Sequence, residues 1–463
     1  MPSRPTSELR LKVPLVGCLL VAVLSLEGCS GAPAPILAPL VQSPSKTPVI
    51  YVPGSTGTEL RDRETQKIVW GRGRQLIVPR DGAYSMARPI HYGPSSDETR
   101  FEVTRAIEKI TVAGVFSQDV YGPIIELLQA NGYQRGDLNA PEAGDSAFLF
   151  AYDWRLDHRL AAQRLHEQLE ALRVARGEER LEVDLICQSN GGYVCRYLLK
   201  YGGASLEDAE AGRAAPPPAI DVRKVVLLGN SNGGSLRMLR EIHRGRRYVQ
   251  LVGRRMRPEV LFSVPAFFQD LPVLRQDLFL DSAGQPLAID IFDADAWQKY
   301  GWSVFAPEAR ARLAKADRQD LFGTETERLQ YLEAVLAYSQ RFHALLRRDV
   351  EGFGDTRYYM LQSRALDTPD RAVLVEENGG WTTLFSGDKR LVQMGEVHQL
   401  ATAEGDGHGT VDSQLWLSPQ ERAALVGEPF YVDADHFELI LQPETHRRML
   451  EVLYDGAAAS NEE

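Results

Sequence analysis

The chain has 463 residues, of which 44% are hydrophobic and 25% are charged, and its net charge at neutral pH is −11. This is the composition of an ordinary globular protein with a large core, built as one domain with insertions or as two domains. Because phosphate neutralisation requires a basic surface, so acidic a chain is not expected to bind nucleic acid.

The N-terminus, residues 1–28, has the pattern of an export signal. Basic residues precede the apolar run "VPLVGCLLVAVLSL", which is short for a membrane-spanning helix and is typical of a signal-peptide core. The run ends in "LEGCS", which resembles a bacterial lipoprotein signal that leaves an acylated Cys29, and Ser30 favours the outer membrane. Glu27 is atypical there, so simple secretion stays an alternative. The Pro/Ala/Ser-rich stretch 29–47 predicts a tether.

Strand-like runs recur along the folded part of the chain. They are "TPVIYVPG", "AFLFAYDW", "LEVDLIC", "VRKVVLLG" and "TRYYMLQS". Helical patterns at 121–133 and 160–177 lie between several of them, which predicts an α/β fold with a mostly parallel central sheet covered on both faces. The predicted organisation is a core at 48–230, an inserted helical cap at 231–354, a second part of the core at 355–455 and a disordered tail at 456–463.

Ser189 lies in "VDLICQSNGGYVCRYLL", between a predicted strand and a predicted helix. At such a junction a sharp turn exposes the serine hydroxyl, and the small residues Gly191 and Gly192 keep the helix close. Cys187 stands where the G-x-S-x-G pattern has its first glycine. The pattern therefore predicts either a nucleophile or a turn residue.

Two other strand ends carry candidate residues. In "VIYVPGSTGTEL", Gly54 allows backbone N–H groups to approach a ligand, although a tight loop is the alternative. In "FAYDWRLD", the side chains of Tyr152, Asp153, Trp154 and Arg155 either shape a substrate pocket or form a structural Asp–Arg pair.

A serine triad in this type of fold requires an acid between the serine and the histidine in the chain. His436, in "YVDADHFELI", follows a short strand-like run. The loop "EGDGHGTVDS" contains His408 and offers Glu404, Asp406 and Asp412, of which Asp406 satisfies the order.

Apart from Cys18 in the signal segment and Cys29, which would be acylated, the cysteines are Cys187 and Cys195. They pair if the compartment is oxidising, but we expect two unpaired, buried small side chains, because one lies on the strand and the other on the helix. No spacing resembles a zinc site, and we expect neither a metal nor a cofactor.

The segment "RMLREIHRGRRYVQLVGRRMR", residues 237–257, holds eight arginines in an otherwise acidic chain. Either it is a solvated helical face with internal salt bridges, or it contacts anionic lipid headgroups.

Seven segments are similar, in order and spacing, to signature segments of the lecithin:cholesterol acyltransferase family. They are "VIYVPGSTGTELRD", "YDWRLD", "CQSNGGYVCRYLL", "VVLLGNSNGGS", "SVPAFFQDLP", "GDGHGTV" and "DHFELI". The family consists of α/β-hydrolase enzymes that include acyltransferases and phospholipases, and the resemblance runs from about residue 48 to about residue 450.

The resemblance implies site residues. Ser189 matches the nucleophile and His436 the catalytic histidine. The backbone N–H of Asn190 matches one oxyanion donor, and the loop with Ser55 and Thr56 matches the region of the other. The insertion matches the cap and lid.

The acid is where the chain departs from the family pattern G-D-x-T-V. Counting back from Thr410 and Val411 without a gap places His408 in the position of the acid. A loop lengthened by two residues would bring Asp406 to His436 instead, and we assign the role of the acid to Asp406. Without an acid, turnover is expected to fall by about 10⁴, because the imidazole is left in the wrong tautomer.

The implied function is a serine-dependent lipid acyl hydrolase or acyltransferase that forms an acyl-enzyme from a lipid ester. The expected protein is a monomer held at a membrane surface by the lipid anchor and the arginine-rich segment. The alternatives are a general carboxylesterase or polyester hydrolase, and a catalytically decayed, lipid-anchored binding protein.

Overall fold

The computed structural model describes residues 47–73, 81–96, 100–112, 116–247, 255–377 and 379–454. The expected signal peptide, Cys29 and the C-terminal tail lie outside the described residues, as does the expected tether apart from its last residue. Within the described ranges, no helix combines the length and the apolar composition that crossing a bilayer requires.

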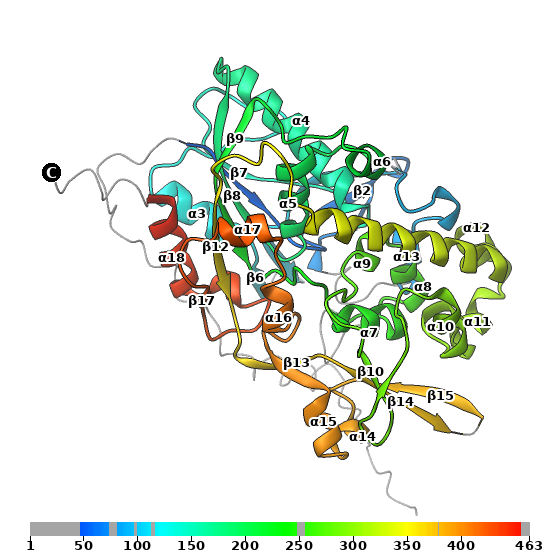
Figure 1. Cartoon of the computed structure of the whole chain (residues 1–463). Helices are drawn as coiled ribbons and strands as arrows, with labels where there is room; N and C mark the ends of the chain where they lie inside the picture. Colours follow the sequence, from blue (N-terminus) through cyan, green and yellow to red (C-terminus); the bar gives the residue numbers. More distant parts are fainter. Residues whose placement is uncertain are drawn as a thin grey trace, which may run out of the picture. The chain divides into compact units, whose positions relative to one another are not determined.

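A six-stranded sheet in the order β17-β12-β9-β8-β1-β7 forms the centre of the fold, and every neighbouring pair is parallel (Figure 1). The strands are β1 (Val49–Val52), β7 (Ala147–Leu149), β8 (Leu181–Gln188), β9 (Ile220–Leu228), β12 (Arg357–Gln362) and β17 (Phe430–Tyr431). The predicted α/β class with a parallel sheet is confirmed.

Helices cover both faces of this sheet. Alternate residues of β1 belong to two different core clusters, one shared with α4 (His158–Arg176) and α5 (Gly191–Tyr201), the other with α3 (Gly122–Ala130) and α18 (Pro443–Tyr454). Strands buried on both sides need apolar residues at nearly every position, which explains why the sequence shows apolar runs here.

Local signals fix the ends of the helices that flank the site. The side chain of Asp157 caps the start of α4 by accepting a hydrogen bond from the backbone of Arg159. Helix α4 ends at Gly177 and α5 at Gly202, both in the left-handed conformation that glycine adopts without strain. Helix α5 starts at Gly191, with Asn190 as its N-cap, and so follows the turn that carries Ser189.

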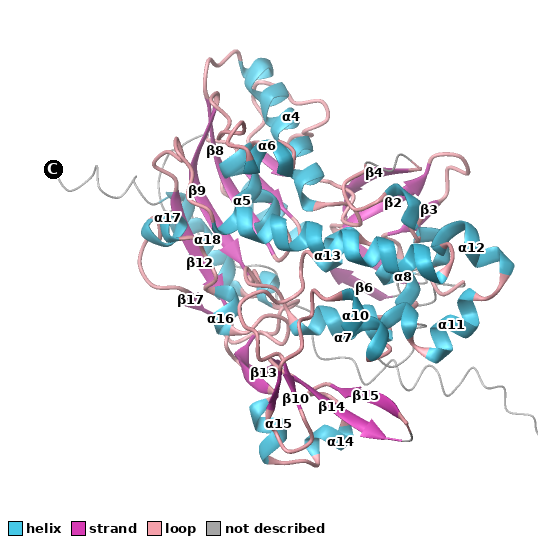
Figure 2. Cartoon of the chain, turned by 45° about the vertical axis from the view of Figure 1, so that its right-hand side comes forward, coloured by secondary structure: helices cyan, strands magenta, loops and turns pink. Residues whose placement is uncertain are grey.

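The segment predicted as an inserted cap is mainly helical. Its helices are α7 (Leu236–Arg244), α8 (Pro258–Phe262), α9 (Pro265–Phe268), α10 (Ala294–Lys299), α11 (Pro307–Leu313), α12 (Ala316–Phe322) and α13 (Glu325–Arg347). A capping box between Thr324 and Glu327 starts α13. This long helix packs on α5 (Figure 2). The ring of Phe342 on α13 stacks on that of Tyr197 on α5, with the centroids 5.4 Å apart.

The chain rejoins the central sheet at β12, shortly after the predicted boundary at residue 354, but it does not stay there. After β12 the chain leaves the central sheet again, and its strands β14 (Ala372–Glu377) and β15 (Gly380–Leu384) join β10 (Phe279–Leu280) and β11 (Pro286–Leu287) from the insertion in a separate four-stranded sheet (Figure 2). Two-residue strands carry no readable period, so the sequence did not indicate this pairing.

Smaller elements complete the described part of the chain. They are the sheet β3-β2-β4 (Ile68–Trp70, Thr58–Asp62, Phe101–Ala106), the pair β5-β6 (Lys109–Val112, Phe116–Asp119), the pair β13-β16 (Leu366–Pro369, Thr402–Gly405), and the short helices α6 (Leu206–Glu210), α14 (Lys389–Val392), α15 (Glu396–Leu400), α16 (Val411–Gln414) and α17 (Pro419–Ala423).

Candidate active site

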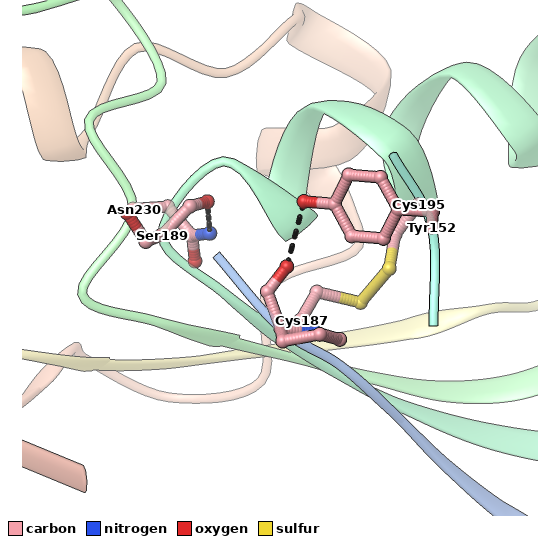
Figure 3. Close-up of a disulfide and its surroundings, with 6 residues drawn as sticks. Tyr152, Cys187, Ser189, Cys195 and Asn230 are labelled. Carbon is pink, nitrogen blue, oxygen red and sulfur yellow. Dashed lines mark hydrogen bonds between the residues drawn. A yellow bond between two sulfur atoms is a disulfide. The ribbon is translucent and has the colours of Figure 1, made fainter. Parts of the chain in front are cut away.

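Ser189 lies on the turn between β8 and α5 with a backbone φ of 52°, in the left-handed region that residues other than glycine rarely occupy. The tight fit around the turn holds it there. A Cβ at Gly191 would lie 2.3 Å from the carbonyl oxygen of Val52, and one at Gly192 would lie 2.3 Å from Asn230 Nδ2. Asn230 Nδ2 also donates to the carbonyl of Ser189 (Figure 3). Such a strained serine is a mark of functional turns.

His436 reaches this turn from far along the chain. Its Nε2 lies 3.0 Å from Ser189 Oγ, and its Nδ1 lies 2.8 Å from Asp406 Oδ2. A carboxylate only accepts hydrogen bonds, so Nδ1 carries the proton and Nε2 is the free acceptor that faces the serine hydroxyl. All three side chains are buried. The structure thus joins Ser189, His436 and Asp406 in one hydrogen-bonded row.

The Asp406 carboxylate is held in its ionised form. Burial on its own raises the pKa, but the neighbouring imidazole of His436 and the backbone N–H groups at the carboxylate outweigh it, so that the pKa is below its ordinary value. Asp406 Oδ1 accepts hydrogen bonds from the backbones of His408 and Gly409, each at 2.8 Å.

His408, which the ungapped count placed in the position of the acid, forms a different pair. Its Nε2 lies 3.1 Å from Asp270 Oδ2, and its ring stacks on that of His436 with the centroids 4.6 Å apart. Burial lowers the pKa of His408, the hydrogen bond to Asp270 opposes this, and the nearby His436 adds to the lowering. Two imidazole–carboxylate pairs therefore lie side by side, and the first of them contacts the serine.

No family model matches the sequence, and no curated protein matches it. Among solved structures, the fold is similar to that of a chain in the crystal structure of the Tle4–Tli4 complex. The TM-score is 0.51 with 14% sequence identity, over 88% of this chain and 98% of that chain. The likeness agrees with the α/β fold and its central six-stranded parallel sheet. At this identity the likeness concerns the fold alone.

The residues expected to form an oxyanion site lie on the turn that carries Ser189 and on the loop after β1 that is hydrogen-bonded to it. Asn190 is at the N-cap of α5, and its backbone N–H makes no hydrogen bond within the described ranges. Its side chain donates to Ser55 Oγ at 2.7 Å, which ties it to the loop after β1. In that loop Thr56 has a φ of 66°, and the N–H of Gly54 is already bound to Gln188 Oε1 at 2.7 Å.

The segment predicted to bind substrate makes mainly structural contacts. The side chain of Arg155 is fully buried and forms a two-pronged ion pair with Asp153, at 2.6 and 3.0 Å. Trp154 is buried between two other aromatic rings. Tyr152 donates its hydroxyl to the carbonyl of Pro53 at 2.8 Å and so supports the loop beside Ser189 (Figure 3). Tyr152 and Asp153 also line a cavity of about 210 Å³.

Cys187 and Cys195 form a disulfide, so the expectation of two unpaired cysteines is wrong (Figure 3). The helix after the turn folds back over the strand before it, and the two Cα atoms come within 6.5 Å. This is within the range that a disulfide spans. The bond closes the strand–turn–helix unit around Ser189.

No sequence pattern predicted a role for Asp270 or Asn230, although both lie in segments that are similar to the family's signature segments. Asp270 contacts His408, and its Oδ1 accepts from the hydroxyls of Ser231 and Tyr193 at 3.2 and 3.3 Å. No local pattern marks either residue, because their partners lie on other elements. Within the described ranges, no group of three or more His, Cys, Asp or Glu side chains could hold a metal ion.

Proposed function

We propose that this protein is a serine-dependent acyl hydrolase or acyltransferase that acts on lipid esters, of the kind found in the lecithin:cholesterol acyltransferase family. The observation that carries the proposal is the row from Ser189 through His436 to Asp406, which starts at a serine on a strained strand-to-helix turn. The α/β fold and the seven similar sequence segments support it.

In the proposed mechanism, His436 Nε2 accepts the hydroxyl proton of Ser189 as Oγ attacks the carbonyl carbon of the ester. Asp406 keeps the ring oriented and stabilises the imidazolium that forms. The C–O bond of the leaving alcohol then breaks, and His436 gives the alcohol its proton. The product is an ester between Ser189 and the acyl group.

The tetrahedral intermediate carries a negative oxygen that needs donors. The N–H of Asn190 supplies one, and the loop with Ser55 and Thr56 supplies another; each donor contributes about 3 to 4 kcal/mol to transition-state stabilisation. Water then cleaves the acyl-enzyme to release a fatty acid, or a bound alcohol takes the acyl group.

The test of the nucleophile uses Ser189→Ala and a fluorophosphonate probe, which labels activated serines. We expect the wild type to be labelled and to release fatty acid from phospholipid, and the variant to do neither while keeping its unfolding midpoint. Ser339→Ala, which removes another buried hydroxyl, is the matched control. An unlabelled wild type would instead identify a decayed binding protein.

The substrate class requires a second experiment. The wild type is incubated with phospholipid, with and without a sterol or simple alcohol, and the products are identified. A transferred acyl group identifies an acyltransferase, and a free fatty acid identifies a hydrolase. If only short soluble esters or polyesters are cleaved, the lipid assignment is wrong and a general esterase is correct.

The proposal includes export and lipid attachment at Cys29. The disulfide between Cys187 and Cys195 supports an oxidising compartment, because such bonds are rare in the cytosol. Cells labelled with a palmitate analogue should incorporate it into the wild type and not into Cys29→Ser. Equal labelling of both would exclude the anchor and leave simple secretion.

A further inference from the structure

The outer face of helix α7 carries a row of arginines. Arg237, Arg240 and Arg244 recur at three- and four-residue spacing and therefore share one side of the helix. The side chains of Leu239 and Ile242, among others, are buried on the opposite side. The helix is thus anchored by an apolar face, and its basic face points away from the core.

Carboxylates compensate this basic face only in part. Arg237 and Arg246 share the single carboxylate of Glu241, with N–O distances of 3.1 and 3.3 Å. Arg244 pairs with Asp388 at 2.6 Å. Within the described ranges, the three guanidiniums on α7 itself, of Arg237, Arg240 and Arg244, therefore have only two carboxylates in contact with them.

Arg240 is at the centre of the row. Within the described ranges its half-buried side chain makes no hydrogen bond and no ion pair. Burial lowers the pKa of its guanidinium, and the charges of Arg237 and Arg244 lower it further, although the more weakly acting charges of Glu241 and Asp388 oppose this. Arg255, whose Nη1 donates to the carbonyl of Arg244, has its pKa lowered by burial and by surrounding arginines in the same way. Removing a cation from water without an anionic partner is unfavourable, so this cluster favours a bound anion.

The same face reaches the candidate active site. Phe437, directly after His436, is 50% exposed, and the guanidiniums of Arg237 and Arg246 lie 5.7 and 5.8 Å from the centre of its ring. Arg237 also donates to the carbonyl of Gly407, in the loop that carries Asp406. An exposed aromatic ring between cations is thus adjacent to the histidine that faces Ser189.

We propose that Arg237, Arg240, Arg244, Arg255 and Phe437 form a docking surface for a membrane with anionic phosphate headgroups. This deepens the proposed function and rests on it, because the surface would present lipid esters beside Ser189. The phosphates bind the arginines, and Phe437 enters the headgroup region. Since the chain as a whole is acidic, attraction to an anionic membrane is confined to basic faces such as this one and orients the protein on it.

The experiment measures binding to phosphatidylcholine vesicles with and without phosphatidylglycerol, using the full chain with Cys29→Ser and Ser189→Ala, so that neither an anchor nor turnover contributes. We expect Arg240→Gln with Arg255→Gln to weaken binding to the anionic vesicles about 25-fold, since each basic group near such a surface contributes about fivefold. Added salt should reduce the wild-type affinity towards that of the variant. Phe437→Ala should weaken binding to both kinds of vesicle.

The matched control is Arg180→Gln with Arg213→Gln, which removes two exposed arginines outside the surface. If this control weakens binding equally, overall charge is responsible and the inference is wrong. It is also wrong if inorganic phosphate displaces the vesicles at low concentration, which would assign the cluster to a soluble anion.

Failure of this inference is separable from failure of the proposed function. In the chain with an intact Ser189, Arg240→Gln with Arg255→Gln should leave the hydrolysis of a short soluble ester unchanged. If vesicle binding is unaffected while the ester is still cleaved, the docking surface is excluded and the enzyme stands. If the wild type cleaves no ester but the variants still weaken vesicle binding, the proposed enzymatic function is excluded and the docking surface stands.

Discussion

The two imidazole–carboxylate pairs, His436 with Asp406 and His408 with Asp270, contain the same chemical groups and stack at 4.6 Å. Both carboxylates are almost fully buried. The pairs differ in what the second nitrogen of each ring meets. His436 Nε2 faces the hydroxyl of Ser189, whereas the ring of His408 is hydrogen-bonded within the described ranges through Nε2 alone, to Asp270.

This difference shows that a histidine bound to an aspartate does not by itself define a catalytic group. The proposed activity comes from the third member, the hydroxyl that the strained turn presents. The second pair acts through the first: its ring covers one face of His436, and the backbone N–H of His408 binds the Asp406 carboxylate. We therefore expect His408 to position His436 rather than to transfer protons.

The largest expected contrast is between His436→Gln and His408→Gln. The first removes the base and should lower kcat by about 10⁵ to 10⁶, as loss of the histidine does in serine proteases. The second keeps a donor for Asp270 and should lower kcat by about tenfold with KM nearly unchanged. Steady-state kinetics on a soluble ester would measure both. Equal losses in the two variants would contradict the division of roles.

Replacing the carboxylate of each pair by an amide should give the next largest difference in kcat. Asp406→Asn should lower kcat by about 10⁴, because an amide favours the wrong tautomer of His436. Asp270→Asn should lower kcat by less than about tenfold and reduce the free energy of unfolding by about 1 to 3 kcal/mol, since its buried hydrogen bonds are disturbed. If Asp270→Asn were the more damaging to kcat, the acid would be assigned to the wrong pair.

The sequence predicted the class of the fold and brought three distant residues into one hypothesis. Ser189 has a local strand–turn–helix signature, and the chain order selected Asp406. The loop around His408 was ambiguous because a count along the sequence cannot tell an insertion from a substitution. In the structure the bend at residues 406–409 brings both Asp406 and His408 to His436.

Other features had no local signal at all. Asp270 lies 138 residues from His408, and its role depends on how the insertion packs on the core. The disulfide depends on how closely α5 folds back on β8, which the eight-residue separation of the cysteines does not reveal. The strand pairs that join residues before and after β12 are too short for periodicity to show.

The disulfide offers a further test of the difference between the two pairs. It spans the turn that carries Ser189, and of the two histidines only His436 is hydrogen-bonded to that serine. Cys187→Ala with Cys195→Ala should lower the free energy of unfolding by about 2.5 kcal/mol, the loop-closure contribution of a short loop. Activity per folded molecule should also fall, since Ser189 is less firmly held against His436. Urea unfolding with and without a reductant would measure the first effect. If the variant unfolds at the same urea concentration as the oxidised wild type, the bond does not stabilise this turn.

The smallest effect concerns the protonation of the second pair. The pKa of His408 is lower in the folded chain than the ordinary value of about 6.5, so between these two values the unfolded chain binds more protons. The stability that this group contributes is therefore present above about pH 6.5 and is lost as the pH falls towards the folded value, by up to about 1.4 kcal/mol per pH unit.

Urea unfolding at about pH 7 and about pH 5 should show a smaller loss of unfolding free energy for His408→Gln than for the wild type. Buried His158 and His343, whose pKa values burial lowers to about 3 and about 4, remain in both proteins and account for part of the loss that persists. Identical losses in the two proteins would mean that His408 binds its proton equally in the folded and unfolded chains, and the second pair would then be ionised beside His436.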